Sequence, residues 1–142
     1  MTHPIRPAGF DHIVLRIIEK EKMIAFYRDV LGCAVDWDRP ELGLTHIRAG
    51  ASLIDLVTVD GKLGALGGAA PGPQGRNLDH FALAIRPFDE AAIRAHLAAH
   101  GVEIDDEGPR YGAEGEGPSI YIRDPEGNTV ELKGPSAPPK GR

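Results

Sequence analysis

The sequence predicts an α+β fold of two β-α-β-β-β modules that form a curved mixed sheet around a cavity. Three observations predict it: alternating apolar strands flank a helical stretch, this order occurs twice, and a Gly/Ala/Pro-rich segment separates the copies. We expect the first module at residues 8–60, a linker at 61–77, the second module at 78–134 and a flexible tail at 135–142.

The first module begins with an apolar strand at residues 10–18, followed by a helix at 19–31. The helix is predicted because Met23, Phe26, Tyr27 and Val30 have the i, i+3, i+4, i+7 spacing of one buried face. Gly32 is a typical residue at the end of a helix. Three short strands are expected after it, at residues 34–37, 44–48 and 52–59.

The second module repeats this order. A strand is expected at 78–86, and a helix follows that begins at the N-cap Asp89 and ends at Gly101. Further strands are expected at 102–104, 119–123 and 129–133. Residues 105–118 are rich in glycine and predict a long loop, either a lid over a site or a disordered excursion.

The two copies share polar residues that an apolar core would not select. Phe10-Asp11-His12 resembles Leu78-Asp79-His80, and Ile54-Asp55-Leu56 resembles Val130-Glu131-Leu132. The last strand follows the turn sequence Asp124-Pro125-Glu126-Gly127-Asn128. A carboxylate such as Glu131 within this strand either faces solvent or enters a site where its charge is matched.

Strand alternation predicts where the shared polar residues point. His12, Val14 and Arg16 lie on one face, and Asp55 shares a face with Leu53 and Val57. If these faces line one concavity, then His12, His80 and Glu131 form a two-His, one-carboxylate set for a divalent metal. Asp55 is then a fourth ligand or a base, whereas the alternative is that each Asp-His pair is a structural hydrogen bond.

Two arginines are further candidates for lining this cavity. Arg16 and Arg48 are candidates for binding an acidic substrate, with surface placement as the alternative. His46 has no partner in the repeat and is interpreted as structural.

Composition excludes several classes of protein. The formal charge of −5 disfavours a nucleic-acid surface, and no apolar run reaches the roughly 20 residues that span a bilayer. The single cysteine, Cys33, cannot form an internal disulfide, and residues 1–7 have no apolar signal core. We therefore expect a cytoplasmic protein with a small-molecule substrate and neither nucleic acid nor membrane as a partner.

The chain resembles the vicinal oxygen chelate superfamily, which includes glyoxalase I, fosfomycin-resistance enzymes, bleomycin-resistance proteins and extradiol dioxygenases. The resemblance covers about residues 8–134 and is carried by DHIVLRI, FYRDVLG, LDHFAL and SIYIRDPEGNTVEL. It implies a glyoxalase-like fold with metal ligands at His12, His80 and Glu131. Asp55 falls where the family usually has a longer Glu or Gln, and Ser119 and Tyr121 match positions that hold substrate oxygens.

The resemblance implies a metal-dependent lyase or isomerase of the glyoxalase I type, acting through an enediolate. Glu131 or Asp55 would then move the proton, with Zn, Ni or Mn as the metal and a homodimer as the assembly. The alternatives are an extradiol-type dioxygenase with Fe(II), and a resistance protein that binds a small molecule such as an antibiotic.

Overall fold

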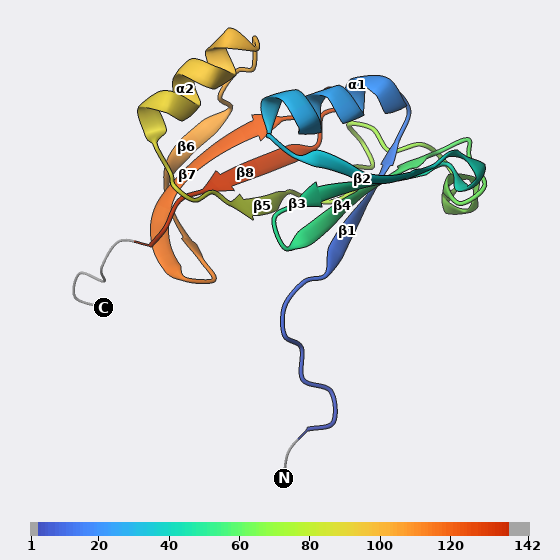
Figure 1. Cartoon of the computed structure of the whole chain (residues 1–142), viewed down its shortest axis with the longest axis horizontal. Coiled ribbons are helices and arrows are strands. Elements are labelled where there is room, and N and C mark those ends of the chain that lie inside the picture. Colours follow the sequence, from blue (N-terminus) through green and yellow to red (C-terminus); the bar gives the residue numbers. More distant parts are fainter. Residues whose placement is uncertain (1–2, 137–142) are drawn as a thin grey trace. The chain divides into compact units, whose positions relative to one another are not determined.

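The computed structural model describes residues 3–136, and the chain divides into two compact units, residues 1–70 and 71–142. Each unit holds one β-α-β-β-β module (Figure 1), as the sequence predicts. The division falls inside the segment predicted as a linker, 61–77. Of the predicted tail, residues 137–142 lie outside the described residues.

Unit 1 is a four-stranded mixed sheet in the order β1-β4-β3-β2, with β1 parallel to β4 and the other pairs antiparallel. The predicted helix is observed as α1 followed directly by a π-helical turn, η1. The elements are β1 (His12–Ile17), α1 (Lys20–Ala25), η1 (Phe26–Val30), β2 (Ala34–Arg39), η2 (Pro40–Leu42), β3 (Leu44–Ala49), β4 (Ser52–Thr58) and η3 (Gly64–Gly67).

The alternation of side chains gives this sheet two different faces. One face carries fully buried apolar side chains, and the helix adds Met23 and Tyr27 to the same core. The sheet's contributions to this core are Leu15, Ile17, Ile47, Ile54 and Leu56. The opposite face presents His12, Asp55 and the half-exposed Val14, so the predicted alternation of side chains along β1 and β4 is confirmed.

Unit 2 repeats the topology, with strand order β5-β8-β7-β6 and β5 parallel to β8. Asp89 caps its helix by accepting a hydrogen bond from the Ala92 N–H at 3.1 Å, as predicted. The elements are β5 (Phe81–Ala84), α2 (Glu90–Ala99), β6 (Asp106–Gly112), β7 (Gly115–Arg123) and β8 (Thr129–Lys133).

The loop predicted at 105–118 is wrong, as is the strand predicted at 102–104. Residues 106–123 form a hairpin in which Asp106 pairs with Tyr121 and Gly112 with Gly115. Its glycines serve close packing: a Cβ at Gly117 would lie 2.5 Å from the Pro135 carbonyl oxygen. Strand formation here follows from ladder pairing and backbone packing rather than from side-chain propensity.

The turn between β7 and β8 is built on the buried carboxylate of Asp124. Its Oδ1 accepts from the Glu126 and Asn128 N–H groups at 2.9 and 3.0 Å, and its Oδ2 accepts from the Asn128 Nδ2 at 2.8 Å. The predicted turn is therefore confirmed. It fixes where β8 begins and so where Glu131 lies within that strand.

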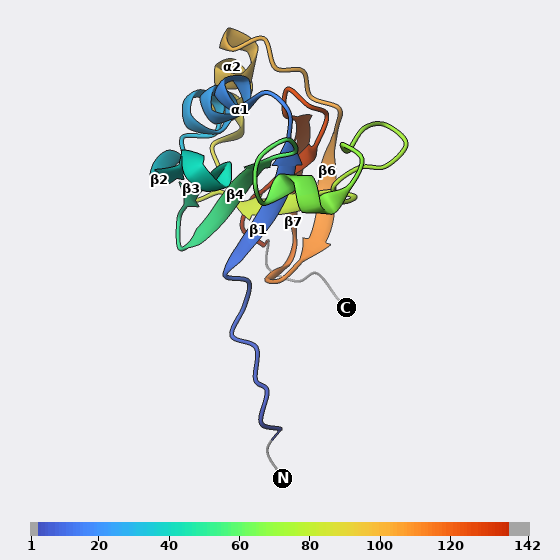
Figure 2. The same ribbon diagram turned by 90° about the vertical axis from the view of Figure 1, so that its right-hand side faces the viewer.

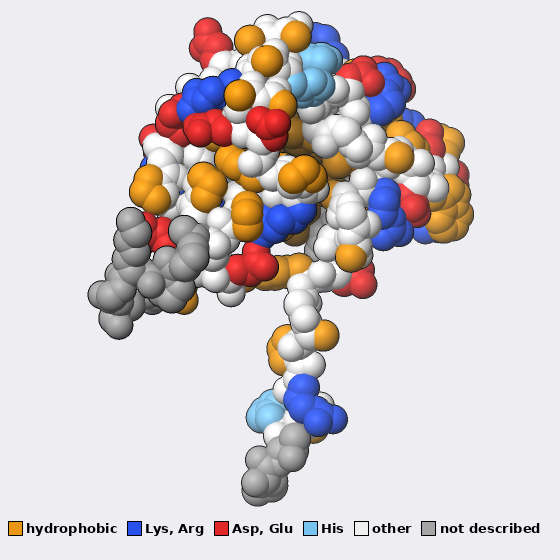
Figure 3. All heavy atoms as spheres, turned by 60° about the vertical axis from the view of Figure 1, so that its left-hand side comes forward, with side chains coloured by type: hydrophobic (Ala, Val, Ile, Leu, Met, Phe, Trp, Pro, Cys, Tyr) orange, Lys and Arg blue, Asp and Glu red, His pale blue; other side chains and the backbone are white. Residues whose placement is uncertain are grey.

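Figure 3 shows acidic, basic and apolar side chains interspersed on the face it draws, without a continuous basic area. Within residues 3–136, no helix is both long and apolar enough to span a bilayer.

Candidate functional site

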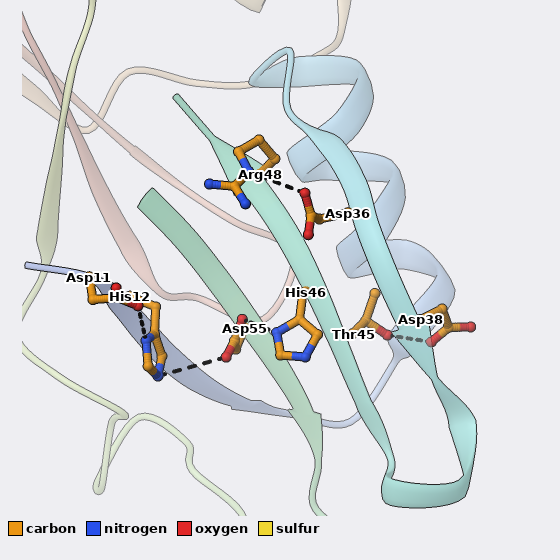
Figure 4. A network of polar contacts seen from close by, with 8 residues as sticks. All are labelled: Asp11, His12, Asp36, Asp38, Thr45, His46, Arg48 and Asp55. Atoms are coloured by element: carbon orange, nitrogen blue, oxygen red, sulfur yellow. Dashed lines mark hydrogen bonds and ion pairs between the residues drawn. The ribbon is translucent and has the colours of Figure 1, made fainter. Parts of the chain in front are cut away.

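In unit 1, two histidines flank the buried carboxylate of Asp55. The strand order places β4 between β1 and β3, so His12 and His46 approach Asp55 from opposite sides (Figure 4). The His46 Nδ1 lies 2.8 Å from the Asp55 Oδ1, and the His12 Nε2 lies 3.9 Å from the Asp55 Oδ2. Asp55 is 5% exposed, so these imidazoles form its main polar surroundings.

In unit 2, Glu131 occupies the equivalent place and is also 5% exposed. Its Oε1 lies 3.2 Å from the His80 Nε2, and its Oε2 accepts a 2.6 Å hydrogen bond from the Ser119 hydroxyl. Tyr121 lies opposite Glu131 in the β7–β8 ladder, and burial first, then interaction with this carboxylate, raise the pKa of Tyr121. The predicted residues Ser119 and Tyr121 thus lie around Glu131.

Each histidine of the repeat is held by the aspartate that precedes it. The His12 Nδ1 lies 2.7 Å from the Asp11 Oδ1, and the His80 Nδ1 lies 2.5 Å from the Asp79 Oδ2. The hydrogen bond to Asp11 is the largest cause of the raised pKa of His12, ahead of the charge of Asp55. A carboxylate on Nδ1 leaves Nε2 as the nitrogen directed toward a ligand, which is the arrangement of metal-binding histidines.

The unit 2 pair fits a divalent ion better than the unit 1 pair. Two donors at about 2.1 Å from one ion lie roughly 3.0–3.4 Å apart at adjacent coordination positions. The 3.2 Å between His80 and Glu131 matches this spacing, whereas the 3.9 Å between His12 and Asp55 is too wide for it. Over residues 3–136, no three His, Cys, Asp or Glu side chains gather closely enough to hold an ion, so the four-residue set remains a prediction.

Each unit has a hollow beside its pair. The unit 1 hollow, of about 320 Å³, is lined by Asp55 and Arg16 and by the apolar side chains Val14, Leu44, Val57 and Leu63. The unit 2 hollow, of about 300 Å³, includes His80, Glu131, Tyr111, Arg86, Glu114 and Lys133. Apolar atoms form most of both linings, and the second hollow has more charged side chains than the first.

One basic side chain in each hollow binds the backbone carbonyls of a neighbouring segment. Arg16 donates to the carbonyls of Gly64, Gly68 and Ala69 at 2.8–2.9 Å, which holds the η3 segment beside β1 (Figure 2). Lys133 donates to the carbonyls of Arg110 and Gly117 at 2.7 and 3.1 Å. The contacts of Arg16 are therefore structural, and its role toward a substrate stays a prediction.

Replacing Arg16 by Met is expected to loosen residues 64–70 while the sheet stays folded. Because charged hydrogen bonds are lost, the free energy of unfolding measured in urea should fall by about 1–2 kcal/mol. Hydrogen exchange should speed up in residues 64–70 in particular, with Arg48→Met as the control. If hydrogen exchange in residues 64–70 is as slow as in the wild type, Arg16 does not hold this segment in place.

Arg48 takes part in a contact that both units share. Its Nε lies 3.2 Å from the Asp36 Oδ1, and the Arg123 Nε lies 2.5 Å from the Asp105 Oδ2 in unit 2. Both arginines are about half-exposed, and such pairs contribute only about 0–1 kcal/mol. The predicted substrate role of Arg48 is not tested by this contact.

The contact between His46 and Asp55 was not predicted from the sequence. It could have been found from the turn at Gly50-Ala51, where Gly50 has φ +60°. A two-residue turn fixes the antiparallel register, and this register pairs His46 with Asp55.

The sequence of this chain matches a known protein family over most of its length. Residues 9–132 match the family model described as the Glyoxalase/Bleomycin resistance protein/Dioxygenase superfamily. Virulence protein STM3117 of Salmonella typhimurium is 33% identical over 125 residues, which cover 86% of this chain and 81% of that protein.

Solved structures show the same fold. The crystal structure of STM3117 has a TM-score of 0.72 at 25% identity and covers 93% of this chain and 100% of that chain. Lactoylglutathione lyase from Agrobacterium tumefaciens has a TM-score of 0.64 at 22% identity, covering 90% and 94%. The fosfomycin resistance protein FosX from Listeria monocytogenes, an E126Q mutant with Mn(II) and 1S,2S-dihydroxypropylphosphonic acid, has a TM-score of 0.67 at 21% identity, covering 92% and 93%.

Proposed function

Since this chain belongs to the Glyoxalase/Bleomycin resistance protein/Dioxygenase superfamily, we propose that it is a metal-dependent lyase or isomerase of the glyoxalase I type. Its substrate is a small molecule with vicinal oxygens that passes through an enediolate. The observation that carries the proposal is the paired histidine and buried carboxylate at equivalent places in the two units.

The proposed ion takes His12 from unit 1 and His80 with Glu131 from unit 2, in one chain or across a homodimer. The 3.2 Å spacing of His80 and Glu131 and the aspartates on both Nδ1 atoms support this set. Zn, Ni or Mn is the expected metal, and a Mn(II) ion accompanies the related FosX. When bound, the ion supplies positive charge that stabilises negative charge on a substrate oxygen.

The chain's own groups supply the proton transfer. Glu131 and Asp55 are the two carboxylates that could move a proton between neighbouring substrate carbons. The Ser119 hydroxyl donates to Glu131 and so fixes the direction of its carboxylate. The hollow of unit 1 suits the hydrocarbon part of a substrate, and the charged side chains in the hollow of unit 2 suit its oxygens.

Metal analysis of protein purified without chelators or a nickel column tests the proposal. We expect about one divalent ion per set of His12, His80 and Glu131, and we expect His80→Ala to lose the ion with its circular dichroism unchanged. The exposed His100 provides the control variant, His100→Ala. Full occupancy in His80→Ala would contradict the ligand assignment. An oxygen-sensitive Fe(II) would favour the dioxygenase alternative, and a metal-free chain a binding protein.

A further inference from the structure

We propose that His46 is a positioning residue that holds Asp55 as a proton-transfer base and keeps it from acting as a direct metal ligand. This inference rests on the proposed function and assigns different tasks to its two carboxylates. It also gives a role to a side chain that has no histidine at the equivalent place in the second unit.

The two units differ at this position of the sheet. In unit 1 the paired residues across the strands are Val14, Asp55, His46 and Trp37. In unit 2 they are Ala82, Glu131, Tyr121 and Asp106. Thus the shorter carboxylate is paired with an imidazole, and the longer one with a phenol.

The hydrogen bond from His46 fixes one oxygen of Asp55. Because a carboxylate only accepts, the His46 Nδ1 carries the hydrogen and donates to Oδ1 at 2.8 Å. Oδ2 is then directed toward His12, at the 3.9 Å separation that is too wide for adjacent ligands of one ion. Asp55 therefore lies near His12 but too far from its Nε2 to share an ion with it as a neighbouring ligand. This position suits a base rather than a ligand.

The imidazole of His46 is itself held in place. It stacks on Trp37 with ring centroids 5.9 Å apart and planes 27° apart. The Arg39 guanidinium lies 4.2 Å from the centre of the Trp37 ring. Only 15% of the His46 side chain is exposed, so its ring cannot turn freely away from Asp55. Figure 4 shows the imidazole directed at the carboxylate from the neighbouring strand.

Two substitutions separate the hydrogen bond from the stacking. His46→Phe keeps an aromatic ring on Trp37 but removes the donor, whereas His46→Asn keeps an amide donor near the Nδ1 position but removes the ring. If His46 acts through its hydrogen bond, Phe should impair the enzyme and Asn should restore it. A residue needed only for packing would give the opposite order.

Three measurements on metal-loaded protein test this, with His100→Phe as the control. The probes are the divalent metal found in the wild type and a 2-oxoaldehyde–thiol adduct whose carbon-bound proton exchange is followed by NMR. For His46→Phe we expect the kcat of this proton exchange to fall about ten- to a hundredfold, with little change in the KM for the adduct. Its affinity for the metal, measured by chelator competition, should be equal or higher, because Asp55 is released to ligate. His46→Asn should match the wild type in all three.

The outcomes distinguish this inference from the proposed function. If the wild type binds metal and exchanges the proton, and His46→Phe does the same at wild-type rates, the role of His46 is overturned alone. A loss of metal affinity in His46→Phe would also overturn it, since Asp55 would then depend on His46 for ligation. A wild type with neither metal nor exchange would overturn the proposed function and this inference with it.

Discussion

Glu131→Gln is expected to lose both the bound metal and proton exchange, with the folded structure retained. The Glu131 Oε2 accepts from the Ser119 hydroxyl, and its Oε1 lies 3.2 Å from the His80 Nε2. An amide that keeps its oxygen on Ser119 turns its N–H donors toward the His80 Nε2 and so occupies the lone pair that would bind the ion. The negative charge that would balance a divalent ion is lost as well.

The expected magnitude is a fall in exchange rate of about a hundredfold or more, as for loss of an essential acid–base or ligand group. Metal content and NMR-detected exchange are measured on the same preparation, with the exposed Glu103→Gln as the charge-matched control. Metal retained with exchange abolished would identify Glu131 as a base that does not ligate. Exchange at the wild-type rate would remove Glu131 from both roles.

The parts of the fold predicted from sequence are those set by local chemistry. The helix cap at Asp89, the turn at Asp124 and the apolar face of β1 depend on residues close together in the chain. The repeat predicted that His12, His80, Glu131 and Asp55 converge on one ion. Within each unit one of these histidines lies near one carboxylate, and the convergence of all four stays a prediction.

The errors have a different physical origin. Glycine-rich residues 106–118 have little side-chain preference for a strand, and they form one because β7 supplies the partner ladder and Lys133 binds two of their carbonyls. The contact of His46 with Asp55 was not predicted either, because it depends on cross-strand register rather than on the repeat. Both misses come from pairing, which a scan along one strand does not include.

The largest expected effect on stability is that of Asp124→Ala. The carboxylate is 4% exposed and accepts three hydrogen bonds, two of them from backbone N–H groups of the turn. Removing it leaves buried donors without their acceptor, which costs about 2–4 kcal/mol. Asp124→Asn keeps one acceptor oxygen, so its free energy of unfolding should lie between those of Asp124→Ala and the wild type. Asp60 is exposed, so Asp60→Ala should be as stable as the wild type.

The same substitution tests whether the turn positions the site. Register between β7 and β8 places Tyr121 opposite Glu131 and begins at Arg123 and Thr129, directly beside the turn. Urea unfolding gives the loss of stability, and metal affinity measured well below the unfolding transition reports on Glu131. We expect both to fall in Asp124→Ala. Reduced stability with wild-type metal affinity would mean that the strand pairing alone, without the Asp124 turn, is enough to hold Glu131 in place.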